Sequence, residues 1–136
     1  MYTNASLTIY NIYFDIATRT DKYQRTLINN VFFDEKKATN RLQSGLDSAD
    51  HVLLLIPFQY SSQSKYVPPK AFDELTDVEG YFTLQNGDRI VKGDTGLDIS
   101  GKISILDEHF EAYTITSVDT KDFGSKSMRH WEVGAR

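Results

Sequence analysis

The chain has few residues of the kinds that perform chemistry, and their spacing does not suit it. Cysteine is absent, and the three histidines are His51, His109 and His130. A zinc site takes its ligands from short local pairs of histidine or cysteine, and these three residues are too far apart to form such a pair. We therefore interpret the histidines as structural or surface residues, and we expect neither a bound metal nor a cofactor.

Acidic residues are the next candidates. Asp88, Asp94 and Asp98 lie among glycines, which raises the hypothesis of a calcium site. An EF-hand loop needs acidic or amide residues at alternate positions followed by glycine, and this segment lacks that pattern. Aspartate and glycine are also the residues that turns use, so a turn is the better interpretation.

Paired carboxylates and phosphate-binding loops are also missing. Asp107, Glu108 and Glu111 fall within one predicted helical turn, whereas the two carboxylates of a glycosidase face each other across a cleft. The segment Gly-Asp-Thr-Gly at residues 93–96 matches neither glycine-rich pattern for phosphate. Because no nucleophile, base or metal set can be assembled, we expect that the protein is not an enzyme.

Aromatic residues are plentiful, with eight tyrosines, eight phenylalanines and one tryptophan. They could stack nucleic-acid bases, but proteins that bind single strands in this way combine aromatics with a positive groove. Here the net charge is −4, and lysine and arginine do not alternate with the strand aromatics. Burial in a core or a subunit interface is the better interpretation. The residues that we assign to core or interface are Phe82, Leu84, Ile90 and Trp131, with Tyr10, Phe14, Phe32 and Phe33 as further strand aromatics.

The composition bounds the kind of protein. A chain of 136 residues fits one domain, which we assign to residues 1–136, and it is long enough to form a core without disulfides. No apolar run approaches the roughly 20 residues of a membrane span. The start of the chain also lacks the features of a signal peptide. We expect synthesis in a cytoplasm and no membrane partner.

Runs rich in apolar, β-branched and aromatic residues predict strands over most of the chain. Residues 7–16 are apolar on both parities, which indicates a strand covered on both faces. Residues 23–33 form a second strand with a bulge expected at Asn29-Asn30, and residues 51–58 form a third. Asn86-Gly87 predicts that residues 81–92 are a two-stranded hairpin. The pattern of residues 113–133 predicts a second hairpin at the end of the chain.

Short helices and long loops separate these strands. We expect a helical turn at residues 36–42 and a short helix after Pro68-Pro69 with Phe72 and Leu75 on one face. Residues 104–107 resemble a capping box, with Ile103, Leu106 and Phe110 at helical spacing. Residues 59–69 and 93–101 are loops. The sum is a mainly β fold, a small antiparallel β-barrel or sandwich-like barrel of six or seven strands. Closure is favoured because it removes exposed edges.

The order of several short motifs resembles that of a known family. These motifs are Thr-Ile-Tyr-Asn at residues 8–11, Arg-Thr-Leu at 25–27 leading to Phe-Phe at 32–33, Ile-Pro at 56–57, Gly-Asp-Arg-Ile-Val-Lys-Gly at 87–93, Tyr-Thr-Ile-Thr-Ser-Val at 113–118, Phe-Gly-Ser at 123–125 and His-Trp-Glu-Val at 130–133. Together they resemble the small β-barrel head–tail connectors of long-tailed phages, which are called minor capsid, head-completion or stopper proteins.

The resemblance implies a structural subunit of the virion neck. It implies a homo-oligomeric ring of about twelve copies, which closes the filled head, contacts portal or adaptor and tail proteins, and surrounds the path of double-stranded DNA. In such proteins a loop narrows the channel. Two alternatives stay open: a tail-terminator ring subunit, and a non-catalytic barrel that binds carbohydrate or single-stranded nucleic acid.

For the channel loop we expect residues 59–69 to be disordered in a free subunit and to point toward the ring axis. Residues 59–66 include no aliphatic side chain that could anchor the tip of this loop. Residues 93–101 are the second candidate. The channel-loop residues that we propose are Gln59, Ser61, Gln63, Lys65 and Tyr66.

Overall fold

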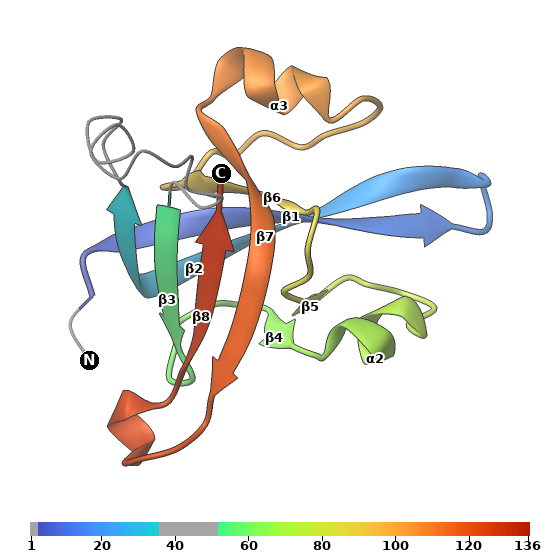
Figure 1. Ribbon diagram of the computed structural model, residues 1–136. Helices are drawn as coiled ribbons and strands as arrows, with labels where there is room; N and C mark the ends of the chain where they lie inside the picture. Colours follow the sequence, from blue (N-terminus) through green and yellow to red (C-terminus); the bar gives the residue numbers. More distant parts are fainter. Residues whose placement is uncertain (1–2, 36–51) are drawn as a thin grey trace.

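A computed structural model describes residues 3–35 and 52–136, and its main feature is a closed antiparallel barrel of six strands (Figure 1). The order around the barrel is β1-β2-β3-β8-β7-β6, and β6 closes it by pairing with β1. The predicted mainly β barrel is therefore confirmed. The barrel strands are β1 (Ala5–Asp15), β2 (Thr20–Glu35), β3 (Val52–Pro57), β6 (Arg89–Lys92), β7 (Ala112–Lys121) and β8 (His130–Ala135).

Smaller elements lie outside the barrel. A two-stranded parallel sheet is formed by β4 and β5. Among the described residues, α2 lies between β4 and β5, α3 between β6 and β7, and the 3₁₀ turn η1 between β7 and β8. The bounds are β4 (Lys65–Tyr66), β5 (Tyr81–Phe82), α2 (Pro69–Asp73), α3 (Ser104–His109) and the 3₁₀ turn η1 (Lys126–Met128). The helical turn expected at residues 36–42 lies outside the described residues.

The barrel interior is filled by aliphatic and aromatic side chains. Alternate residues of β3 point inward, so that Val52, Leu54 and Ile56 are buried while Leu53 and Leu55 are only partly covered. This alternation is what a strand with one face on a core requires. A barrel of so few strands has room inside only for its own side chains. The core includes Leu7, Ile9, Ile28, Val31, Phe33, Phe82, Leu84, Ile90, Ile115, Trp131, Val133 and Ala135.

The β1–β2 hairpin is longer than the barrel and projects from it (Figure 1). Beyond Tyr10, β1 pairs only with β2, since its pairing with β6 ends at that residue. The predicted strand covered on both faces is therefore confirmed for the inner half of β1 and wrong for the outer half. We call residues 12–23 the hairpin arm. The predicted bulge is also confirmed, because the register shifts opposite Asn29-Asn30 and Asn30 has a φ of 62°.

The hairpin predicted for residues 81–92 is wrong. β5 runs parallel to β4, whereas β6 pairs with β1 on one side and β7 on the other. Both edges of β6 are thus used in closing the barrel, and none is left for β5. Asn86-Gly87 still forms a tight turn, but Gly87 N donates to Ile115 O at 2.8 Å, so the turn is fixed to β7.

Gly87 is expected to be sensitive to substitution because its φ is 95°, a backbone conformation that side chains with a Cβ rarely adopt. A Cβ built there meets no other atom within 4 Å, so the cost is conformational. Gly87→Val should lower the free energy of unfolding by about 1–2 kcal/mol, measured by urea denaturation. The neighbouring exposed Asn86→Ala is the control, and equal effects of the two substitutions would contradict the strained turn.

The predicted helix near residue 104 is confirmed as α3, but its capping box is not. Ile103 occupies the N-cap position with helical backbone angles, and no side chain caps the helix. Asp107 instead lies 3.0 Å from the Arg89 guanidinium of β6. This ion pair holds the helix against the barrel strand, where Leu106 joins a second core cluster. That cluster consists of Tyr10, Val91, Ile99 and Leu106.

The short helix after Pro68-Pro69 and the closing hairpin are confirmed, but Leu75 does not share the helix with Phe72. Proline begins α2, and Phe72 is buried as expected. Leu75 follows the end of the helix and is half-buried. The closing hairpin is formed by β7 and β8, whose pairing runs from Lys121 opposite His130 to Ile115 opposite Ala135.

Candidate functional site

The first candidate channel loop, residues 59–69, is held to the barrel by hydrogen bonds. Asn29 N donates to Ser61 O at 2.7 Å, and the Ser62 hydroxyl donates to Leu27 O at 2.7 Å. The Tyr60 hydroxyl accepts a hydrogen bond from Tyr66 N at 2.9 Å. The expected disordered tip is therefore wrong. Its orientation toward a ring axis stays a prediction.

The reason for this order lies in the aromatic side chains of the loop. Tyr66 lies 4.3 Å from Trp131 between ring centroids, and Tyr60 packs edge-on against Phe82 at 5.4 Å. Aromatic rings bury as much surface as aliphatic anchors do, and the sequence argument counted only aliphatic residues. Of the other loop residues, Lys65 belongs to β4. Gln59, Ser61 and Gln63 are exposed.

The four residues assigned to core or interface all lie in the core. Phe82, Leu84 and Ile90 are almost completely buried, and Trp131 is 7% exposed. Trp131 forms the centre of an aromatic cluster at one end of the barrel, with Phe58 at 4.4 Å between ring centroids. The loop therefore closes the barrel end instead of moving freely above it.

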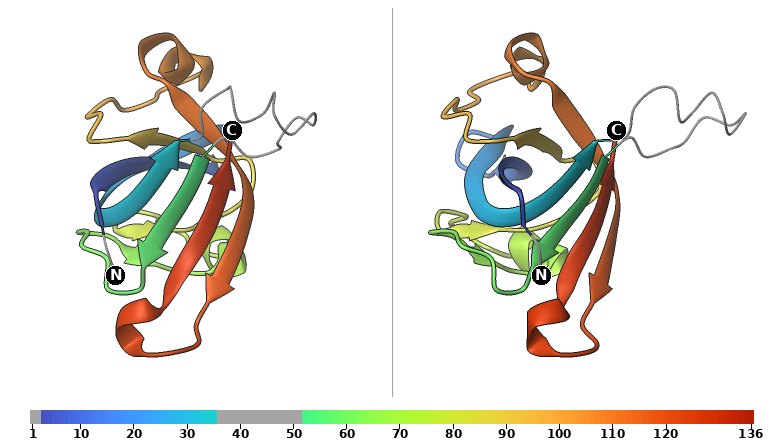
Figure 2. Two further views of the ribbon diagram at one scale, coloured as in Figure 1. Left: turned by 60° about the vertical axis from the view of Figure 1, so that its left-hand side comes forward. Right: turned by 90° about the vertical axis from the view of Figure 1, so that its left-hand side faces the viewer.

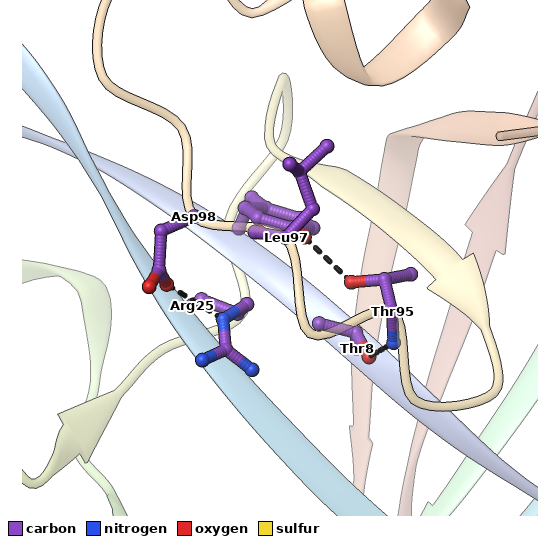
Figure 3. Close-up of polar contacts among 6 residues, drawn as sticks. Thr8, Arg25, Thr95, Leu97 and Asp98 are labelled. Carbon is purple, nitrogen blue, oxygen red and sulfur yellow. Dashed lines mark hydrogen bonds and ion pairs between the residues drawn. The ribbon is translucent and has the colours of Figure 1, made fainter. Parts of the chain in front are cut away.

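The second candidate channel loop, residues 93–101, is also held in place. The Tyr10 hydroxyl donates to Leu97 O at 2.5 Å and lies 2.6 Å from the Thr95 hydroxyl. Figure 3 shows Thr8 beside Thr95 and Arg25 beside Asp98. The Arg25 Nε and Asp98 Oδ1 atoms are 2.7 Å apart. Burial raises the pKa of Tyr10, so this hydroxyl stays a hydrogen-bond donor. Both candidate loops are thus parts of the packed fold.

The residues considered for chemistry are dispersed. Within residues 3–35 and 52–136, no group of three or more His, Cys, Asp or Glu side chains is arranged to hold a metal ion. His109 is exposed on α3, and His130 Nδ1 lies 2.8 Å from Met128 O. His51 lies outside the described residues. Asp98 is used in the ion pair with Arg25.

Sequence reasoning missed a buried polar network around Asp88. The Asn11 amide donates to Asp88 Oδ2 at 2.7 Å and to Thr83 O at 2.8 Å, and its oxygen accepts from Thr83 N at 3.1 Å. Ile12 N donates to Asp88 Oδ1 at 3.3 Å. Burial raises the pKa of Asp88, and the hydrogen bond from Asn11 opposes this. The network joins β1 to residues 83–88 and so fixes the base of the hairpin arm.

Sequence reasoning also did not predict which apolar side chains are exposed at the surface. On the hairpin arm, Phe14 is 60% and Ile16 is 81% exposed, and Ile12 on the same face is partly exposed. At the end of the β7–β8 pair, Phe123 is 71% and Met128 is 55% exposed. We call residues 121–130 the β7–β8 end; Figures 1 and 2 show it projecting from the barrel.

A groove accompanies the hairpin arm. It has a volume of about 590 Å³ and lies between the end of the arm and α2 with the turn that follows. Phe72 and Val78 are its buried apolar members. The groove is lined by Tyr13, Phe14, Asp15, Ile16, Ala17, Phe72, Asp73, Glu74, Leu75, Thr76 and Val78. The arrangement offers apolar contact surface with acidic groups and is suited to binding another polypeptide segment.

Comparisons with known proteins place the chain by family alone. None of its described helices is long and apolar enough to cross a membrane. No curated protein and no solved structure matches the chain. The match to a family covers residues 2–136, which is almost the whole sequence. The chain thus belongs to DUF6751, a family of unknown function.

Proposed function

We propose that this protein is a non-catalytic structural subunit of a phage neck, where copies form a ring that closes the DNA-filled head and docks the tail. The observation that carries the proposal is the position of the exposed apolar side chains. Apart from Ile105 on α3, the exposed large apolar side chains of the described residues gather at two projecting parts of a barrel whose interior is filled, the hairpin arm and the β7–β8 end. Such surface is typical of contacts with other proteins.

Two different apolar surfaces favour a ring over a simple dimer. A two-fold dimer uses one self-complementary surface, whereas a head-to-tail contact uses two different ones and closes into a ring when the rotation fits. Phe14 and Ile16 lie on the arm, and Phe123 and Met128 lie on the β7–β8 end. Each copy therefore has two unlike surfaces to offer to two neighbours.

The motifs that resemble phage connectors lie side by side in the barrel, which supports the proposal. Ile56 and Pro57 at the end of β3 pair with Trp131 and His130 of β8. The segment at residues 87–93 contains β6, which pairs with β1 and β7. Motifs that are far apart in the sequence thus belong to neighbouring strands of one barrel. This arrangement is expected if the resemblance reflects a shared fold.

The negative net charge suits a protein that surrounds DNA without binding it tightly. The net charge is −4, and residues 61–100 carry seven acidic against four basic residues. An acidic surface repels the phosphate backbone and does not retain it by counterion release. In the neck, the partners would be portal or adaptor protein on the head side, tail protein on the other side, and DNA in the channel.

The test is to locate the protein in particles released by cells that carry its gene. Gold-labelled antibody against it should mark the junction of head and tail in electron micrographs. Deleting the gene should give heads that have lost their DNA and carry no tails, and a plasmid copy of the unaltered gene should restore complete particles. DNA-filled, tailed particles formed without the protein would contradict the proposal.

The same experiment separates the alternatives. A tail-terminator subunit leaves filled heads beside unattached tails of abnormal length when its gene is deleted. A barrel that binds carbohydrate or single-stranded nucleic acid leaves the head–tail junction unlabelled. Either result replaces the neck-connector function.

A further inference from the structure

The groove beside the hairpin arm combines an apolar floor with unpaired acidic groups. Phe14, Ile16 and Leu75 line it together with the buried Phe72 and Val78. An apolar pocket of this kind is where a protein partner places an aromatic anchor. A volume of about 590 Å³ accommodates one aromatic side chain together with the residues on either side of it.

The charges at the groove have one sign. Its lining contains the carboxylates of Asp15, Asp73 and Glu74, and no lysine or arginine is among the described residues that line it. Asp15 is paired with Lys22 at 2.7 Å. No ion pair joins Asp73 or Glu74 to another residue of the described part of the chain. These two exposed carboxylates are available to a basic partner.

The β7–β8 end has the complementary character. Phe123 and Met128 are its exposed apolar side chains, and residues 121–130 carry three basic residues, Lys121, Lys126 and Arg129, against one acidic residue, Asp122. An aromatic side chain flanked by cations matches an apolar groove flanked by carboxylates. Opposite potentials of this kind select partner and register.

We propose that the groove of one copy binds the β7–β8 end of the next copy, with Phe123 inserted between hairpin arm and α2. The basic residues of that end then face Asp73 and Glu74. The hairpin arm and the β7–β8 end project in different directions from the barrel (Figures 1 and 2). Because the groove lies beside the arm, one copy does not fill its own groove. The contact is head-to-tail and rests on the proposed function, since it is the contact that builds the ring.

The natural absence of cysteine permits a direct test by disulfide cross-linking. Thr76→Cys places a thiol in the groove, and Ser125→Cys places one in the β7–β8 end. When the two purified single variants are mixed at high concentration and oxidised, a disulfide-linked dimer should form about tenfold faster than with a control pair, a preference equal to about 1.4 kcal/mol. The control pairs Thr76→Cys with Ser100→Cys, an exposed serine outside the proposed contact.

Two changes should abolish the preference. Phe123→Asp in the Ser125→Cys chain removes the anchor, and D73K together with E74K in the Thr76→Cys chain reverses the groove charge. Adding K121E and K126E to the Ser125→Cys chain should restore cross-linking to the reversed groove, because the charges are again opposite. Restoration by charge exchange is not expected of a variant that has merely lost its fold.

Equal cross-linking rates for the groove pair and the control pair would overturn the inference. This outcome leaves the proposed function intact if gold label still marks the particle neck, since the ring would then use another contact. Conversely, preferential cross-linking together with an unlabelled neck would retain the head-to-tail contact and reject the phage-neck function.

Discussion

Trp131→Ala is expected to lower the free energy of unfolding by about 3–5 kcal/mol, which is the usual cost of removing a large aromatic side chain from a core. Trp131 contacts the rings of Phe58, Tyr60 and Tyr66 at centroid distances of 4.4, 6.1 and 4.3 Å. Alanine leaves these rings around an empty space. Because Tyr60 and Tyr66 belong to the loop of residues 59–69, that loop should loosen as the barrel end opens.

The matched control is Phe123→Ala, which removes an aromatic side chain that is 71% exposed. This substitution should change the stability of the isolated chain by no more than about 0.5 kcal/mol. Urea unfolding followed by far-UV circular dichroism is the suitable measurement, since the chain has one tryptophan and fluorescence would lose its probe. Equal losses in both variants would contradict the central position of Trp131 in the core.

The barrel could be predicted from the sequence because apolar runs rich in β-branched and aromatic residues mark its strands. In β3, alternate apolar residues point into the core, and in the closing pair β7 and β8 are joined by a connection of only eight residues. These are local signals, and closure follows from them because an open sheet exposes its edges. The bulge at Asn30 was predictable for the same reason, since asparagine tolerates positive φ.

The errors arise where local and long-range preferences conflict. Asn86-Gly87 specifies a turn and nothing about which strands pair beyond it. The barrel takes both edges of β6, and β5 pairs with β4 instead. The capping box is likewise not formed, and Asp107 instead makes an ion pair with the Arg89 guanidinium at 3.0 Å. In both cases a contact far away in the sequence replaces the expected local one.

The groove could not be predicted because it depends on where the barrel ends. Tyr10, Ile12, Phe14 and Ile16 share one parity of a continuous apolar run, and nothing in that run indicates that only Tyr10 is covered. The change from buried to exposed follows from the length of β6, which pairs with β1 no further than Tyr10. The second wall comes from α2, about 60 residues later in the chain.

The second large effect is expected at Asn11, whose side chain makes three hydrogen bonds inside the protein, to Asp88 Oδ2 and to both backbone groups of Thr83. Asn11→Ala leaves these buried groups without that partner, and the free energy of unfolding should fall by about 2–4 kcal/mol. Asn86→Ala is the control, because Asn86 is exposed on the nearby turn and should cost little.

The loss of stability caused by Asn11→Ala should depend on pH, because Asp88 titrates next to the removed side chain. Burial raises the folded-state pKa of Asp88, and the hydrogen bond from Asn11 lowers it, so the substitution should raise that pKa further. A carboxyl whose folded pKa lies above its unfolded value contributes stability that is fully present below the unfolded pKa and is lost as the pH rises through the folded pKa. Removing Asn11 enlarges this loss.

The difference in unfolding free energy between Asn11→Ala and the unaltered protein should therefore be larger at neutral pH than at about pH 4, near the ordinary pKa of an aspartate. Urea unfolding of both proteins at each pH gives this difference, and the other carboxyl groups largely cancel because both chains contain them. An NMR titration of the Asp88 carboxyl carbon should show the raised pKa directly. A difference that is independent of pH would mean that Asn11 stabilises the fold by neutral hydrogen bonds to Thr83 alone, and that Asp88 does not sense its loss.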